Sequence, residues 1–138
     1  MSTTIDASIV IGAPRPSVWF TLLNFGAYSR WMDRVEEVRK VGETLHWRAD
    51  LGGGRVEWEA EIVAMDDDER LEWHARGSGP HDTRFELASE GENVTRVTVH
   101  DRLRPEGALE GAGTAVRLGK CRLQKDLENL KRRLESLE

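Results

Sequence analysis

Cysteine is almost absent from this chain of 138 residues, since Cys121 is the single one. One cysteine cannot form an internal disulfide, and a chain without disulfides suits a reducing compartment. The sequence also lacks an apolar run of about eighteen residues, the length that a membrane-spanning helix needs. It has no charged-then-apolar leader at its N-terminus. We therefore expect a cytoplasmic protein with no membrane span.

The chain also has fewer basic than acidic residues. Lys and Arg number 20 against 25 Asp and Glu, so the formal net charge is −5 at pH 7. A phosphate backbone would repel such a chain on average, so nucleic acid is not an expected partner. The length, with no long spacer, predicts one domain over residues 1–138, which buries roughly two-thirds of its unfolded surface.

The N-terminal segment begins with alternating apolar residues and stops at two prolines. Ile5, Ala7, Ile9 and Ile11 share one face of an extended segment. Pro14 and Pro16 have the fixed φ favoured at a first helical turn, so a helix should follow through residues 18–23. A second short helix is expected over residues 25–32.

From there to Pro105 the pattern has period two, which is typical of strands. Residues 45–51 and 56–62 alternate on either side of Gly52–Gly54 and predict a hairpin. The later strands place further apolar or small side chains on the same side: Leu71, Trp73, Ala75, Thr83, Phe85, Leu87, Val97 and Val99. Polar residues lie between them, so we expect an antiparallel sheet with one dry face.

A long helix from about residue 110 should cover that face. Apolar residues recur in it at helical spacing: Ala112, Val116, Leu123, Leu127, Leu130, Leu134 and Leu137. The first half instead holds several small residues, namely Gly111, Gly113, Ala115 and Gly119. Their missing side chains predict a cavity beneath that half of the helix.

The order of these pieces resembles the polyketide cyclase/dehydrase group of the SRPBCC, or START-related, superfamily. The segments that carry the resemblance are 7–19, 45–47, 58–62, 71–73 and 126–127. The resemblance implies an α+β helix-grip fold, with a curved antiparallel sheet of about seven strands around the long C-terminal helix. Two short helices should follow the first strand. It also implies an interior cavity for a lipid, a quinone or a polycyclic aromatic molecule.

The resemblance implies no single function, because such folds host enzymes, carriers and regulators. In the aromatase/cyclases of this group, a tyrosine and an arginine contribute to the pocket. The corresponding positions here are Val35 and Ile62, and Tyr28 stands where a pocket tryptophan usually lies. Loss of the arginine removes a cation that could stabilise an enolate or phenolate, so an inherited cyclase mechanism would need other residues.

Aromatic side chains are the first candidate ligand contacts. Tryptophans can simply fill a core, or they can wall a pocket for flat polycyclic ligands. Under the second interpretation, the candidate ligand-binding residues are Tyr28, Trp31, Trp47, Trp58, Trp73, Phe85, Val99 and Val116.

A histidine and a carboxylate on the last two strands are the candidate catalytic residues. If the turn centres on Gly91, Thr83 pairs with Val99, and His81 then lies opposite Asp101 on the inward face. A carboxylate beside an imidazole favours its protonated form and fixes its orientation, which suits acid/base work on a ketone or hydroxyl. The alternative is a solvated strand-end ion pair of little energetic value.

No metal or cofactor is expected. His46, His74 and His100 fall on outward strand positions without the ligand spacing of a metal site, and the acidic run 66–69 lacks that of a calcium loop.

Three functions remain open. The first is a binder or carrier of a hydrophobic small molecule, and the second is an aromatase/cyclase or dehydratase acting on a polyketide-like substrate. The third is a protein-interaction module whose interior is only core. The polar outer face of the sheet offers no apolar docking patch, and the chain is expected to be a monomer or a homodimer.

Overall fold

The structure is a computed structural model that describes residues 3–50, 54–77, 81–103 and 112–136, without the side chains of residues 3 and 112–119. Within these described residues, three helical segments and seven strands follow one another. They are β1 (Thr3–Ile11), α1 (Arg15–Leu23), the 3-10 helix η1 (Phe25–Arg30), β2 (Val35–Val41), β3 (Thr44–Asp50), β4 (Arg55–Asp66), β5 (Arg70–Ala75), β6 (His81–Gly91), β7 (Val94–Leu103) and α2 (Ala112–Glu135).

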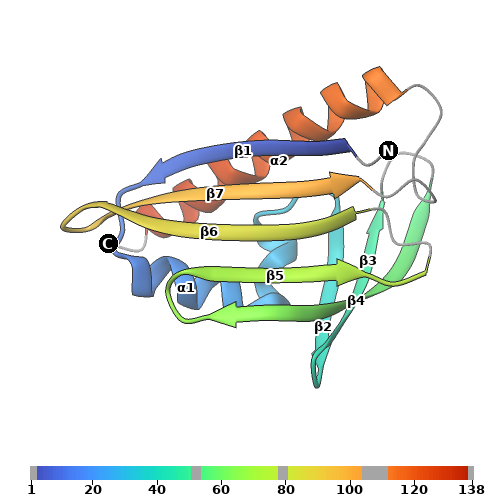
Figure 1. Cartoon of the computed structure of the whole chain (residues 1–138), viewed down its shortest axis with the longest axis horizontal. Helices are drawn as coiled ribbons and strands as arrows, with labels where there is room; N and C mark the ends of the chain where they lie inside the picture. Colours follow the sequence, from blue (N-terminus) through green and yellow to red (C-terminus); the bar gives the residue numbers. More distant parts are fainter. Residues whose placement is uncertain (1–2, 51–53, 78–80, 104–111, 137–138) are drawn as a thin grey trace.

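The strands form one sheet in the order β1-β7-β6-β5-β4-β3-β2, and every neighbouring pair is antiparallel. The sheet is curved, α2 crosses behind it, and α1 lies near the C-terminal end of α2 (Figure 1). The expected α+β helix-grip architecture, with its long C-terminal helix and two short helices after the first strand, is confirmed.

The side chains expected on the dry face are buried. Leu71, Phe85 and Val97 are at most 1% exposed, because alternate residues of a strand point to the same side of the sheet. On α2 the apolar stripe is buried through Leu123, Leu127, Leu130 and Leu134. Its proximal members Ala112 and Val116, the small residues at 111–119 and Leu137 lie outside the described residues or side chains, so the cavity beneath that half stays a prediction.

Of the two prolines expected in the first helical turn, Pro16 lies there, whereas Pro14 comes just before the helix. Pro14 is the N-cap of α1 in an extended conformation, and Pro16 stands in the first turn. A first-turn residue has no intrahelical acceptor for its N–H, so proline loses nothing there. The distal end of α2 is then tied to the end of β1: Glu135 Oε2 accepts the Gly12 N–H at 2.8 Å, and Lys131 Nζ donates to the Val10 carbonyl at 3.1 Å.

The expected register between the last two strands is wrong by two residues. His81 pairs with Leu103, and Asp101 pairs with Thr83. The turn lies beyond Gly91, where Asn93 adopts a positive φ of 120°. A bulge between Ser89 and Gly91 shifts the pairing of β6 with β7. Asparagine is one of the few residues that tolerates positive φ, so the turn did not require the glycine.

Candidate ligand-binding site

Aromatic rings on the concave face form one connected group. Trp47 and Trp58 face each other across β3 and β4, with their planes 3° apart and their ring centroids 5.7 Å apart. Trp73 lies 5.5 Å from Trp47 and 5.8 Å from Phe85. The Tyr28 ring, on η1, has its centroid 5.9 Å from that of Trp47 and 4.9 Å from that of Trp31. These rings from β3, β4, β5, β6 and η1 therefore make a continuous wall.

Most of the predicted ligand contacts are deeply buried in this wall. Tyr28, Trp31, Trp47, Trp73, Phe85 and Val99 are at most 5% exposed, and Trp58 is partly buried against the core. The side chain of Val116 is outside the described part of α2. Much of the wall is therefore packed against itself, as in a core, and its partly open end lies at Trp58.

Two polar atoms within the wall have no partner among the described residues. The indole Nε1 atoms of Trp31 and Trp47 are buried and make no hydrogen bond there. A buried donor without an acceptor costs about 1–3 kcal/mol, so such groups are rare in folded proteins. Tyr28 differs, because its hydroxyl donates to the Leu22 carbonyl at 2.5 Å. Its complete burial raises the pKa of Tyr28 well above the usual value.

A polar trio stands beside the open end of the wall. The Thr83 hydroxyl donates to Asp101 Oδ1 at 2.6 Å, and His81 Nδ1 lies 3.3 Å from Thr83 Oγ1 and 3.9 Å from Asp101 Oδ1. The His81 ring contacts Trp58 edge-on at 6.4 Å. Although the expected pairing is wrong, the structure still brings His81 and Asp101 together, diagonally and through Thr83. The side chain of Asp101 is 14% exposed and that of His81 is 31% exposed, so the trio is neither fully buried nor fully solvated.

Asp126 is a further acidic group on the inner side of α2 that the sequence analysis did not single out. Burial, together with the charges of Asp33 and Asp101, raises its pKa to about 7. Its Oδ1 accepts the backbone N–H of Asp33 at 3.3 Å, which moderates that rise. Its position three residues after Leu123, on the apolar stripe, was the available sequence signal.

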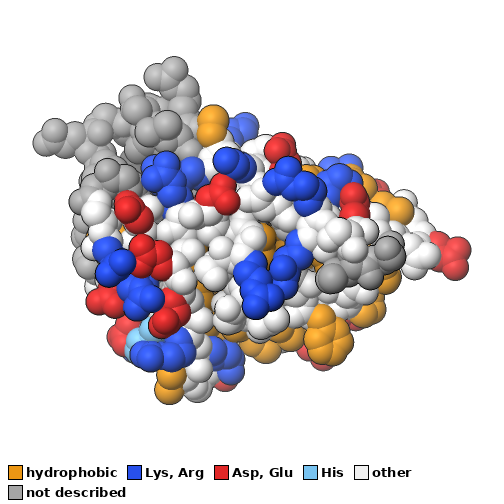
Figure 2. All heavy atoms as spheres, turned by 180° about the vertical axis from the view of Figure 1, so that it is seen from behind, with side chains coloured by type: hydrophobic (Ala, Val, Ile, Leu, Met, Phe, Trp, Pro, Cys, Tyr) orange, Lys and Arg blue, Asp and Glu red, His pale blue; other side chains and the backbone are white. Residues whose placement is uncertain are grey.

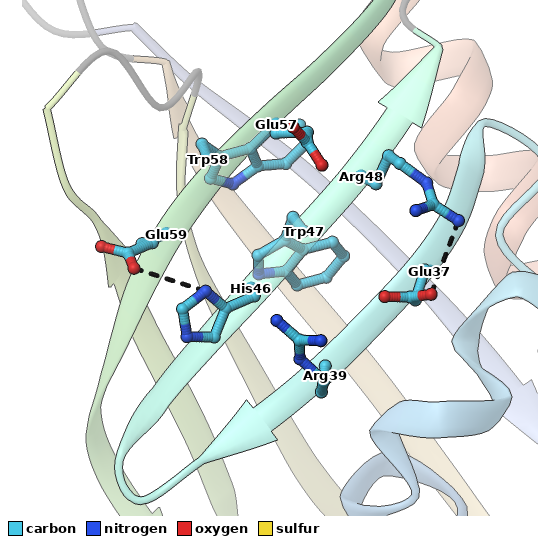
Figure 3. Close-up of a pocket in the computed structure, with 8 residues that line it drawn as sticks. All are labelled: Glu37, Arg39, His46, Trp47, Arg48, Glu57, Trp58 and Glu59. Carbon is cyan, nitrogen blue, oxygen red and sulfur yellow. Dashed lines mark hydrogen bonds and ion pairs between the residues drawn. The ribbon is translucent and has the colours of Figure 1, made fainter.

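Away from the aromatic wall, a hollow of about 280 Å³ lies on the outward side of β2, β3 and β4 (Figure 3). Charged and polar side chains line it together with Trp47 and Trp58: Glu37, Arg39, His46, Arg48, Glu57 and Glu59. His46 Nδ1 is 3.3 Å from Glu59 Oε2, and Arg48 Nη2 is 3.5 Å from Glu37 Oε2. Charges that already pair with one another do not suit an apolar ligand, so the concave wall is the better candidate site.

Comparison with protein families gives one match across almost the whole chain. Residues 2–135 match the family described as polyketide cyclase/dehydrase and lipid transport. The chain belongs to this family. Its fold and its family together support hydrophobic-ligand binding in general, in agreement with the resemblance seen in the sequence.

Solved structures with this fold match the chain at low sequence identity, and one curated protein matches it in sequence. A START superfamily protein from Mycobacterium smegmatis has a TM-score of 0.85 at 14% identity, with 98% of this chain and 99% of that chain covered. An aromatase/cyclase from Streptomyces sp. R1128, Zhui, has a TM-score of 0.78 at 14% identity, with 98% and 94% covered. An uncharacterised 17.2 kDa protein of Streptomyces lincolnensis is 25% identical over 133 residues, which is 95% of this chain and 89% of that protein.

The two positions that the resemblance assigns to the cyclases' tyrosine and arginine differ in their surroundings. Ile62 is 7% exposed on β4, whereas Val35 begins β2 and is partly buried.

Within the described residues, no helix is long and apolar enough to cross a membrane, and no group of three His, Cys, Asp or Glu side chains could hold a metal ion.

Proposed function

We propose that this family member binds a hydrophobic small molecule, an aromatic compound, a quinone or a lipid, against the concave aromatic wall. The observation that carries the proposal is the pair of unpartnered indole N–H groups of Trp31 and Trp47 within that wall. A ligand carbonyl or ether oxygen would give such a donor the acceptor that the described protein groups do not supply.

The rings around these donors support a flat ligand. Offset stacking and edge contacts on Trp47, Trp58 and Trp73 add to the free energy that apolar burial provides. The ligand's polar end would lie at the His81–Thr83–Asp101 trio, where the wall is partly exposed. The family's description, which includes lipid transport, agrees with a ligand of this class.

Native mass spectrometry of freshly purified protein tests the proposal, followed by solvent extraction and accurate-mass analysis of what is retained. We expect a stoichiometric apolar molecule that bears at least one oxygen acceptor. Protein that is free of such a molecule, and that takes up none from a panel of quinones, fatty acids and polycyclic ketones, would contradict the proposal.

A second candidate function is acid/base catalysis, as in an aromatase/cyclase or a dehydratase, and the trio's hydrogen bonds favour it. Because the Thr83 hydroxyl gives its proton to Asp101, its oxygen is left to accept one from His81 Nδ1. A neutral His81 that carries its proton on Nδ1 has a free lone pair on Nε2. That nitrogen could take a proton from a ligand carbon next to a ketone and return it to a leaving hydroxyl.

The His81→Ala and Asp101→Asn variants distinguish a carrier from such an enzyme. In an enzyme, both variants retain the extracted ligand but no longer convert it to a dehydrated or cyclised product. In a carrier, wild type and variants bind equally and none produces a new mass. His74→Ala is the matched control, because His74 faces outward on β5 and pairs with Glu72.

A further inference from the structure

A second hollow, of about 530 Å³, lies where the C-terminal half of α2 passes η1 and the segment after it. Its lining residues are polar or charged: Arg30, Asp33, Asn129, Arg132, Arg133 and Ser136. We call it the basic hollow. It belongs to the side of the molecule that α2 crosses, where groups of Lys and Arg side chains are visible (Figure 2).

Positive charge in the basic hollow is not balanced by the protein groups described. Asp33 is the single acid in its lining, and Lys125 Nζ already lies 3.2 Å from Asp33 Oδ2. Among the described residues, no carboxylate is within ion-pair distance of Arg30, Arg132 or Arg133, in a chain whose net charge is −5. Convergent like charges repel one another, so an anion would relieve the repulsion.

One of the arginines is held in place by a fixed side chain. Asn129 Nδ2 donates to the Trp31 carbonyl at 3.1 Å and to Asp33 Oδ1 at 3.2 Å. This leaves Asn129 Oδ1 to accept from the guanidinium of Arg132. The contact uses one N–H of the guanidinium and leaves other N–H groups of Arg132 for a ligand.

The end of a helix explains part of this charge but not all of it. The last carbonyls of α2 favour cations, which accounts for Arg132 and Arg133 in its final turns. Arg30 belongs to η1 and comes from about a hundred residues earlier in the chain, so the α2 dipole gives no reason for its presence.

We propose that the basic hollow binds the phosphate group of a phosphomonoester or a diphosphate. Guanidinium groups match a phosphate's paired oxygens with two parallel hydrogen bonds, which an ammonium group does not. The hollow is about 530 Å³ and open to solvent, so it leaves room for a group larger than a single phosphate. The site is separate from the aromatic wall and stands or falls independently of the proposed function.

The test uses two probes with the full-length chain: inorganic pyrophosphate in calorimetric titration, and flotation with phosphatidylcholine vesicles that contain phosphatidic acid. The variant Arg30→Gln/Arg132→Gln/Arg133→Gln should weaken binding by about tenfold or more, since charged hydrogen bonds are lost. The control Arg48→Gln/Arg70→Gln/Arg96→Gln removes the same charge from outward arginines that are already ion-paired. It should change binding by less than about twofold.

The two arms identify the source of the phosphate. If wild type binds pyrophosphate and the triple variant does not, the ligand is a soluble phosphorylated molecule. If wild type binds only the vesicles and the triple variant does not, the ligand is a lipid headgroup. If wild type binds neither probe, or if the control loses as much affinity as the variant, the proposal is overturned. Should the triple variant fail to fold, the exposed Arg30 is tested alone: Arg30→Gln should lose more affinity than Arg30→Lys.

Discussion

Thr83 and Asp101 lie directly opposite each other on β6 and β7, and the threonine hydroxyl donates to the carboxylate over 2.6 Å. This one contact joins His81 to Asp101 at the partly exposed end of the aromatic wall. It gives the carboxylate an internal partner, and it leaves the threonine oxygen to accept from the imidazole. The trio's geometry therefore depends on a buried hydroxyl.

Replacing that hydroxyl should be costly. Thr83→Val keeps the shape of the side chain but leaves Asp101 without its donor, so we expect a loss of about 1–2 kcal/mol in the free energy of unfolding. Urea denaturation measures it. Thr98→Val, on the outward side of the same strand pair, is the matched control. Equal stabilities of the two variants would show that the Thr83–Asp101 bond contributes nothing.

Asp126 should make stability fall as pH rises. The pKa of Asp126 in the folded protein is about 7, above the ordinary 3.8, so the folded state holds the proton more tightly than the unfolded one. The stability that the Asp126 proton contributes to the folded state is complete below about pH 4 and is lost as the pH rises through about 7. Asp126→Asn should therefore be more stable than wild type at pH 8.5, by about 1–2 kcal/mol, and close to it at pH 4.

Urea denaturation at the two pH values checks this, with Asp67→Asn as the control. Asp67 is an exposed acid in the turn after β4, and its replacement should leave the pH dependence unchanged. A pH profile of Asp126→Asn that runs parallel to wild type would contradict the argument.

Asp82 should act in the opposite direction. Burial alone would raise the pKa of this carboxyl, but hydrogen bonds from Arg102 and from the Ala75 N–H lower it below the ordinary value. Its contribution to stability is therefore present above about pH 4 and is lost as the pH falls through the lowered value. Arg102 is half exposed, so screening limits the effect, and Asp82→Asn should cost about 1 kcal/mol at pH 7.

Thermal unfolding of wild type and Asp82→Asn between pH 7 and pH 3 measures this effect. The difference in melting temperature should shrink as the pH falls below 4. A constant difference over that range would mean that the charge of Asp82 is not what stabilises the fold.

Periodicity was enough to predict the strands and the covering helix, and the family resemblance added the helix-grip arrangement. Alternation placed Leu71, Phe85 and Val97 inward, and helical spacing placed Leu127 and Leu130 on the covering helix, because burial selects apolar residues at those positions. Register was not predictable in the same way. Moving a strand by two residues keeps every side chain on its face, so the pattern could not distinguish Thr83 from His81 as the partner of Asp101.

The candidate site was predictable only in part. The aromatic residues followed from composition and alternation, but the burial of the Trp31 and Trp47 N–H groups without an acceptor depends on ring orientation, which spacing does not give. The elevated pKa of Asp126 arises first from its burial and then from the charges of two acids that are distant in sequence, Asp33 and Asp101. Only the folded chain brings these three together.

The central claim is that the aromatic wall binds an oxygen-bearing apolar ligand through its indole donors. Titration with Nile red tests it most directly, because Nile red is a neutral polycyclic dye with a carbonyl group. Wild type should bind it saturably. Trp47→Phe and Trp31→Phe, which keep an aromatic ring but remove the N–H, should each weaken binding by about five- to tenfold. Trp19→Phe, on α1 and outside the connected rings, should bind like wild type. Equal affinity in all four proteins, or no saturable binding by wild type, would contradict the account.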